Sequence, residues 1–179
     1  MNIVVISDIH GSNYYMNKMK ERIEIENPDK IILLGDLYYH GPRNPLTDEY
    51  NPSEVAKTLN SFKDKIIAVK GNCDAEVDQM ISEFKINDEY ITNLNGKIFY
   101  FTHGHKFNID NLPEEEFDVL VYGHFHTGFI KQKDNKIFVN SGSISLPKND
   151  TKNSYLSIDD ENIYLKDIEG NIIDQIKFN

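Results

Sequence analysis

The chain has 179 residues, of which 29 are acidic and 19 basic, so its formal net charge is −10. A surface this acidic repels polyanions, which argues against broad electrostatic binding to long nucleic acids. The single cysteine, Cys73, excludes an intrachain disulfide, and no apolar stretch is long enough to cross a bilayer. The amino terminus carries no basic segment before its short apolar run, so the sequence predicts a cytoplasmic protein without signal peptide or membrane anchor.

The first half of the chain alternates predicted strands and helices in a βαβαβ pattern. Unbroken apolar runs predict strands buried on both faces, and capping residues mark the helix starts. Ser12 is the expected cap of the first helix, whose apolar stripe contains Tyr15, Met19 and Ile23. The predicted elements are a strand at 2–7, a helix at 12–27, a strand at 31–36, a loop at 37–51, a helix at 52–62, a strand at 65–70 and a short helix at 75–83.

The second half is predicted to be mostly β-structure. An Asn95-Gly96 turn between two apolar runs is typical of a hairpin. The predicted strands lie at 90–94, at 97–101 and at 117–122, and short strands of an antiparallel meander fill 128–178. No linker or internal repeat divides the chain, so we predict one α/β domain, residues 1–179, built on two packed sheets.

Five of the predicted strands deliver Asp, Asn or His at one end, where open α/β sheets place their ligands. All six histidines lie between residues 10 and 126. A lone histidine is more often structural than a ligand, but this clustering beside carboxylates favours ligation. The strand-end motifs are Asp8-Ile9-His10, Gly35-Asp36, Gly71-Asn72, His103-Gly104-His105 and Gly123-His124-Phe125-His126.

The residue types at these strand ends point to bound metal. Nitrogen and oxygen donors without thiolates suit Mn²⁺, Fe, Zn²⁺ or Ni²⁺, and one cysteine excludes a cysteine-rich structural zinc site. The candidates are too many for one ion. We therefore predict two ions that share a bridging carboxylate, at the separation of roughly 3.5–4 Å typical of hydrolytic metal pairs. Asp36 is the candidate bridge.

The same motifs, in the same order, resemble those of the calcineurin-like metallophosphoesterases. Three stretches extend the resemblance to the small bacterial phosphodiesterases of the YfcE type: residues 40–44, 71–80 and 120–124. The resemblance covers nearly the whole chain and thins towards its carboxyl terminus. It implies the metallophosphoesterase fold, a four-layer α-β-β-α sandwich of two mixed sheets.

The resemblance also implies an activity and a set of ligands. The expected enzyme hydrolyses small phosphodiesters with a bridging water or hydroxide activated by a dinuclear centre, with Mn²⁺ the first choice and Zn²⁺, Fe or Ni²⁺ as alternatives. Asp36 and Asn72 are then also catalytic residues. One ion would be held by Asp8, His10, Asp36 and His126, and the other by Asp36, Asn72, His103 and His124.

Four positions around the expected site are open to more than one interpretation. Cys73 stands where many members of the superfamily carry histidine, so the proton donor to the leaving group is left open between water and His105. Cys73 itself is either a substrate contact or a small residue packed behind the metals. His40 and Arg43, in the 37–51 loop, are candidate substrate contacts, with loop or subunit contacts as the alternative. Residues 140–143, Asn-Ser-Gly-Ser, are expected near the site without ligating metal.

Two other functions stay open from the sequence. The retromer complex contains a non-catalytic subunit of this fold, so a scaffold is one alternative, although this chain keeps every ligand position. The same site could also serve a phosphomonoesterase or a nuclease. The sequence names neither the physiological substrate nor the oligomeric state, so a homo-oligomer is left open, and no membrane partner is predicted.

Overall fold

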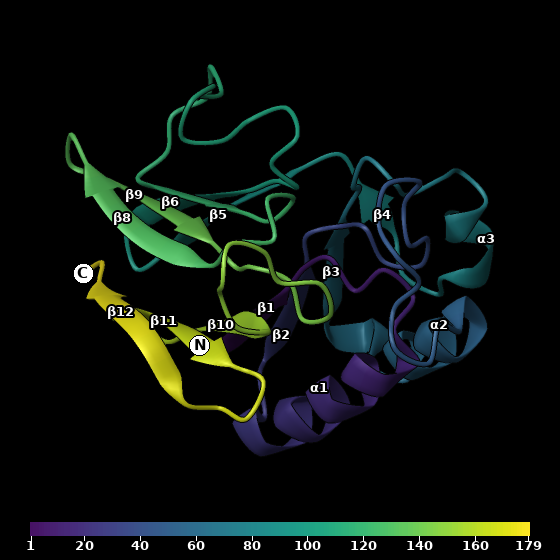
Figure 1. Cartoon of the computed structure of the whole chain (residues 1–179). Coiled ribbons are helices and arrows are strands. Elements are labelled where there is room, and N and C mark those ends of the chain that lie inside the picture. The colour runs from purple at the N-terminus through teal and green to yellow at the C-terminus, as the bar shows by residue number, and fades with distance from the viewer.

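Two β-sheets face each other in the computed structural model, which describes all 179 residues (Figure 1). The larger sheet contains β1 (Ile3–Ile6), β2 (Lys30–Leu33), β3 (Ile66–Val69), β4 (Ile86–Asn87), β10 (Ser154–Ile158), β11 (Asn162–Asp167) and β12 (Ile172–Lys177). The smaller contains β5 (Tyr90–Leu94), β6 (Lys97–Phe101), β7 (Val119–Tyr122), β8 (Phe129–Lys133) and β9 (Lys136–Asn140). The helices are α1 (Asn13–Glu26), α2 (Pro52–Asn60) and α3 (Asp78–Ile81), with a 3-10 turn at Lys63–Lys65.

Both sheets are mixed, as predicted. The larger has the strand order β12-β11-β10-β1-β2-β3-β4, and the smaller β5-β6-β7-β9-β8. Parallel pairs join β1 to β2, β2 to β3 and β3 to β4, and in the other sheet β6 to β7 and β7 to β9. The remaining pairs are antiparallel. The parallel strands are central in the smaller sheet and run out to the edge strand β4 in the larger, and in both sheets their carboxyl ends can meet at one edge of the molecule.

The central strands of the larger sheet are buried on both faces because two separate cores cover them. In β1, Val4 and Ile6 join the core under α1 and α2, whereas Ile3 and Val5 join the core between the sheets. Successive strand side chains point to opposite faces, so burial of both faces gives an unbroken apolar run rather than an alternating pattern. Figure 1 shows α1 and α2 on the outer side of this sheet.

Helix α1 begins as predicted, but its buried stripe is shifted by one residue at the start. The Ser12 hydroxyl accepts the Tyr15 N–H at 3.3 Å, and Asn27 ends the helix in the left-handed conformation. The buried side chains are Met16, Met19 and Ile23. Tyr15 only packs against the margin of the core. Spacings of three and four residues keep 16, 19 and 23 on one face of the helix.

The second half departs from the predicted antiparallel meander at 128–178. Strands β8 and β9 belong to the smaller sheet, and β9 pairs in parallel with β7, whereas β10, β11 and β12 extend the larger sheet. The hairpins follow from local turns, but the chain crosses between the sheets at 141–153, which no local pattern records. The two-residue strand β4 was also not predicted, and the predicted helix at 75–83 is a single turn, Asp78–Ile81.

The outer face of the smaller sheet is covered by irregular chain. Tyr100, Leu120, Tyr122 and Phe138 form a third core there with Phe117, and Phe107 and Ile109 pack against it. Residues 102–118 therefore supply the outer layer on this side without forming a helix. No helix has the length and apolarity to cross a membrane, since the longest, α1, has 14 residues.

A half-buried ion-pair cluster joins the end of α1 to the larger sheet. The Glu26 carboxylate accepts hydrogen bonds from Lys166 Nζ at 2.8 and 2.9 Å and from the Tyr155 hydroxyl at 2.7 Å, and Arg22 lies 3.3 Å away. The Glu26 side chain is only 11% exposed. Burial by itself raises the pKa of Glu26, but the hydrogen bonds from Lys166 and Tyr155 outweigh it and hold the pKa below its usual value.

We predict that Glu26→Gln lowers the free energy of unfolding by about 1–3 kcal/mol near neutral pH, because a charge-assisted cluster loses its anion. The ionised carboxylate stabilises the fold above the unfolded-state pKa of about 4.3, and this contribution disappears as pH falls through the lower folded-state pKa. The gap between wild type and variant should therefore narrow on acidification. Urea unfolding across this pH range measures it, with exposed Glu24→Gln on the same helix as control. A gap that stays constant down to about pH 3 would contradict the assignment.

Candidate metal centre

The carboxyl ends of five strands from both sheets meet at one place. Two hydrogen bonds cross from sheet to sheet there: the His124 N–H donates to the Asp8 carboxylate at 2.9 Å, and His103 Nδ1 donates to the Leu34 carbonyl at 2.6 Å. The structure thereby brings together all seven predicted metal ligands, which follow β1, β2, β3, β6 and β7: Asp8, His10, Asp36, Asn72, His103, His124 and His126.

Asp8, His10 and His126 form the first group of candidate ligands. Asp8 Oδ1 lies 3.2 Å from His126 Nε2 and 3.6 Å from His10 Nε2, and the two Nε2 atoms are 3.2 Å apart. Each ring uses Nδ1 to donate to a backbone carbonyl, His10 to Tyr39 at 2.8 Å and His126 to Leu146 at 2.6 Å. In the neutral rings both Nε2 atoms therefore carry an unprotonated lone pair that can accept a hydrogen bond or bind a metal ion.

The second group contains Asp36, Asn72, His103 and His124. His103 Nε2 lies 3.0 Å from Asn72 Oδ1, 3.2 Å from His124 Nδ1 and 3.4 Å from Asp36 Oδ2. Asp36 Oδ2 is also 3.7 Å from His10 Nε2, so this one oxygen faces both groups. The other oxygen of Asp36 accepts the Cys73 N–H at 2.8 Å. Asp36 is thus the only candidate ligand held between the two groups.

These contacts test whether the residues fit metal ions. Acceptor atoms from several side chains face one another, and the buried Asp8 Oδ1 has no hydrogen-bond partner. Buried polar atoms in folded proteins are almost always satisfied, and clustered acceptors repel unless a cation lies among them. Imidazole and carboxylate donors whose outer atoms are fixed by backbone groups are the usual environment of divalent transition metals. The site therefore fits bound divalent metal ions.

The backbone at the site adopts a conformation that few residues tolerate. Asp, Asn and His enter the left-handed region more readily than other non-glycine residues, and such strain gathers at functional sites. Five of the seven candidate ligands have positive φ: Asp8 (55°), His10 (48°), Asp36 (54°), His124 (64°) and His126 (58°). The chain therefore turns sharply after β1, β2 and β7, just where these side chains face the others.

Two glycines allow these strand ends to approach closely. A Cβ atom on Gly71 would overlap Asp36 Oδ1 and the Asp36 backbone nitrogen. One on Gly123 would overlap the Ser7 hydroxyl and crowd the Asp8 carboxylate. The glycines before Asn72 and His124 are thus required by sterics.

Asp74 is a buried residue of the site that the sequence did not single out. Its carboxylate accepts the backbone N–H groups of Asp36, Leu37 and Gly71 at 2.8, 2.8 and 2.7 Å. It therefore ties the ends of β2 and β3 together behind the ligands. The signal in the sequence was its place two residues after Asn72, but a single aspartate in a turn is too common to interpret alone.

The 140–143 turn packs against the site, as predicted. The Ser143 hydroxyl donates to the Asp8 carbonyl at 2.7 Å, and Ser145 donates to the same oxygen at 3.0 Å. Asn140 donates to the Gly123 carbonyl at 2.7 Å. These residues support the backbone of the ligands rather than facing the acceptor cluster.

The protonation of the site reflects its clustered charges. Burial opposes ionisation of Asp8, but the neighbouring imidazoles of His10 and His126 hold its pKa well below the usual range. Burial also opposes the charged form of His103, whereas Asp36 and Asp8 raise its pKa to about 9. Burial, followed by the charge of His103, lowers the pKa of His124 to about 4. Metal ions must displace the proton on His103, so binding at the site releases protons.

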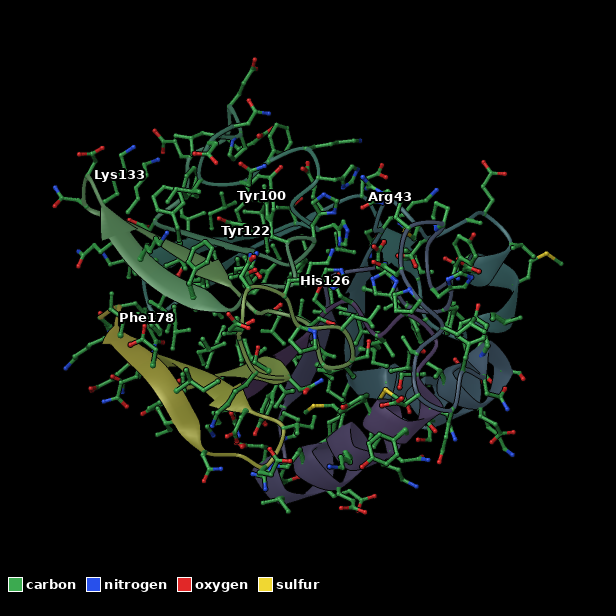
Figure 2. All side chains as sticks on the ribbon, in the orientation of Figure 1. Arg43, Tyr100, Tyr122, His126, Lys133 and Phe178 are labelled. Atoms are coloured by element: carbon green, nitrogen blue, oxygen red, sulfur yellow. The ribbon has the colours of Figure 1, made fainter.

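A hollow of about 610 Å³ opens over the ligands. It is lined by His10, Asp36, Asn72, His124 and His126 together with Gly41, Pro42, Arg43, Asn44, Cys73, Phe125 and Lys148. Figure 2 shows Arg43, from the 37–51 loop, in the same region as His126. Of the predicted substrate contacts, Arg43 and Cys73 therefore face the site. His40 instead contacts its own loop, with Nδ1 3.3 Å from the Asn44 carbonyl and its ring against Tyr39 and Tyr50.

Cys73 and His105 lie on different sides of the ligands. Cys73 Sγ falls within the cluster formed with His10 and Asp36, and burial together with the Asp36 charge raises its pKa to about 12. The His105 ring centroid is 5.5 Å from that of His103, but His105 lines a second hollow of about 410 Å³ with Lys70 and Lys106. Burial and the His103 charge lower the pKa of His105.

Comparison with known proteins gives consistent matches. Residues 1–162 match the model of the calcineurin-like phosphoesterase superfamily domain. The chain is 40% identical over 163 residues to phosphodiesterase YfcE of Escherichia coli, covering 90% of this chain and 89% of YfcE. A solved structure of YfcE, a phosphoesterase from E. coli, superposes with a TM-score of 0.96 over 100% of both chains at 37% identity. Vps29 from Entamoeba histolytica complexed with Zn²⁺, 20% identical with a TM-score of 0.63 over 100% of both chains, shares the fold.

We predict that Gly71→Ala lowers metal affinity by about tenfold or more, because its methyl group must displace the Asp36 carboxylate. Calorimetric titration with Mn²⁺ measures the affinity, and circular dichroism checks that the fold is kept. Gly96→Ala is the control, since Gly96 has a positive φ of 87°, where a side chain strains the backbone, but its Cβ would meet no atom within 4 Å. Equal Mn²⁺ affinity in the two folded variants would contradict the steric argument.

Proposed function

The chain belongs to the calcineurin-like phosphoesterase superfamily and is a phosphodiester hydrolase, and we propose that it cleaves small phosphodiesters at a centre of two divalent ions. The observation that carries the proposal is the pair of acceptor groups that share Asp36, whose Oδ2 faces His103 at 3.4 Å and His10 at 3.7 Å. A mononuclear site would need neither this shared oxygen nor seven converging ligands.

The ligands divide between two ions. Asp8, His10 and His126 hold one ion, with Asp36 as the fourth ligand. Asn72, His103 and His124 hold the other, again with Asp36. We propose Mn²⁺ as the ion, with Zn²⁺, Fe or Ni²⁺ as alternatives, because imidazole and carboxylate donors suit all four.

When bound, such an ion pair lowers the pKa of a coordinated water and neutralises charge on the phosphoryl oxygens. The residues of the chain prepare the site for this chemistry. Asp36 and Asn72 lie on the side of the site that faces the hollow. The backbone carbonyls of Tyr39, Leu34 and Leu146 accept hydrogen bonds from His10, His103 and His126 and so orient these three imidazoles. Fixed orientation of the ligands matters because catalysis depends on groups already in place before the reaction.

The hollow supplies positive charge from side chains as well. Arg43 and Lys148 both line it, both are exposed, and neither forms a salt bridge with a carboxylate. In a chain with a net charge of −10, two unpaired cations over the ligands provide a local attraction for an anionic diester. The guanidinium of Arg43 can hold two phosphate oxygens at once.

The leaving group has two candidate proton donors. With a pKa of about 12, the Cys73 thiol stays protonated at neutral pH and is at best a weak donor. A neutral His105 still offers one N–H, but it approaches the ligands from the second hollow. We therefore propose His105 or solvent as the donor for substrates that extend towards that side, with Cys73 as a contact that packs against Asp36.

We predict that the protein binds two Mn²⁺ ions per chain and that Asp36→Ala abolishes binding of at least one, with a loss of diesterase activity of at least about 100-fold. Elemental analysis of reconstituted protein and hydrolysis of bis-p-nitrophenyl phosphate measure the two effects. Exposed Asp110→Ala is the matched control. A reproducible content of one ion in wild type would rule out the dinuclear centre. Two tightly bound ions without any hydrolysis would instead favour a scaffold.

We predict that Arg43→Ala raises the KM for a small diester by about tenfold while kcat changes little, if the guanidinium contacts ground state and transition state alike. Steady-state kinetics on metal-loaded protein measure both parameters. Lys133→Ala is the control, because Lys133 is an exposed cation at the opposite side of the molecule from Arg43 (Figure 2). If both parameters stay at their wild-type values, Arg43 serves the loop or a subunit contact instead.

A further inference from the structure

Phe125 is the only exposed phenylalanine in the structure. The chain contains 10 phenylalanines, and the others are buried or half-buried in the three cores. Phe125 is 44% exposed, although it follows a central strand and lies between two candidate metal ligands, His124 and His126. A large apolar side chain exposed inside a polar site gains no burial from the fold of this chain.

The Phe125 ring is held in place by its neighbours. Its N–H donates to the Gly123 carbonyl at 2.7 Å, and the residues on both sides have positive φ. The ring forms edge-to-face contacts with His124, at a centroid distance of 5.2 Å, and with Tyr122, at 6.2 Å. Tyr122 is fully buried, so the partner on the protein side is rigid. An aromatic ring ordered before a ligand arrives loses little entropy on contact.

The lining of the 610 Å³ hollow shows what kind of group the ring can meet. Apart from the imidazoles, Phe125 is the only aromatic side chain in the lining, and its neighbours there include Asn44, Arg43 and Lys148. A flat apolar face among polar groups suits a ligand that is flat and aromatic on its faces and polar at its edges. The volume is within the usual range of small-molecule sites and leaves room beside a phosphate.

We propose that Phe125 stacks on a planar heterocyclic base, so that the substrates are nucleotide-type diesters in which one ester substituent is a nucleoside. This inference rests on the proposed function, because the phosphate of such a substrate would lie on the metal ligands beside the ring. Stacking on an aromatic side chain is strong and tolerates every base, since each base has a π-face. Aliphatic diesters, which lack such a face, would gain little from the same position.

The test compares binding of two monoesters to Zn²⁺-loaded protein by calorimetry. Adenosine monophosphate and the matching methyl riboside phosphate share sugar and phosphate and differ only in the base. Wild type should bind adenosine monophosphate about tenfold more tightly than the riboside phosphate. That preference should fall to near one in Phe125→Ala and Phe125→Leu and persist in Phe125→Trp, which keeps an aromatic face. Upfield shifts of the adenine proton resonances should likewise appear with wild type and disappear with Phe125→Ala.

The controls separate stacking from other roles of the residue. Ile91→Ala removes an equally exposed apolar side chain, 40% exposed, on β5 outside the hollow, and should keep the preference. Metal content is measured for every variant, because Phe125 adjoins two candidate ligands. No preference for the base in wild type, or a preference that Phe125→Ala or Phe125→Leu retains, overturns the inference. Absence of any diester hydrolysis by Mn²⁺-loaded wild type overturns the proposed function independently, since calorimetry does not require turnover.

Discussion

The arrangement of the candidate metal centre depends on one buried carboxylate that is not itself among the seven candidate ligands. Asp74 accepts three backbone N–H groups, two from the end of β2 and one from the end of β3. These bonds hold Asp36 in contact with the Gly71-Asn72 turn. This contact positions Asp36 Oδ2, the oxygen that faces both groups of imidazoles. Burial raises the pKa of Asp74, whereas the three N–H donors favour its charged form. A buried carboxylate that is fully hydrogen-bonded can fix backbone more rigidly than packing alone.

The ligands themselves carry an energetic cost that the fold accepts. Asp8 and Asp36 are buried carboxylates, and five candidate ligands hold left-handed backbone conformations. Burying unpaired charge and straining backbone both destabilise a folded chain. Bound cations would offset the cost of burying the two carboxylates. The three apolar cores of the sheets supply the stability that the strained strand ends lack. Metal binding and stability of this region are therefore coupled.

The candidate ligands and the side chains that line the two hollows lie in different parts of the structure. The ligands follow strands common to the fold, and a superposition with a TM-score of 0.63 at 20% identity shows that the fold extends beyond close relatives. The side chains that line the two hollows, among them Arg43, Lys148, Phe125 and His105, belong to segments between the strands. Loops on a rigid scaffold commonly decide which ligand is recognised, because they can change without disturbing the core.

The sequence by itself identified the candidate ligands and most of the first half of the fold, because both are recorded locally. An apolar run followed by Gly-Asp or Gly-Asn identifies a buried strand and its end, and Ser12 and Asn51 mark helix starts wherever the helices later pack. Only the tertiary structure decided that β9 pairs with β7, that Asp74 reaches Asp36 and Gly71, and that His40 and His105 lie away from the hollow over the ligands. It also decided that Phe125 is exposed there rather than buried like Ile9 and Leu37, which also adjoin candidate ligands. These outcomes depend on contacts between residues distant in the chain, and such contacts are set by the mutual packing of two sheets rather than by any periodicity along one of them.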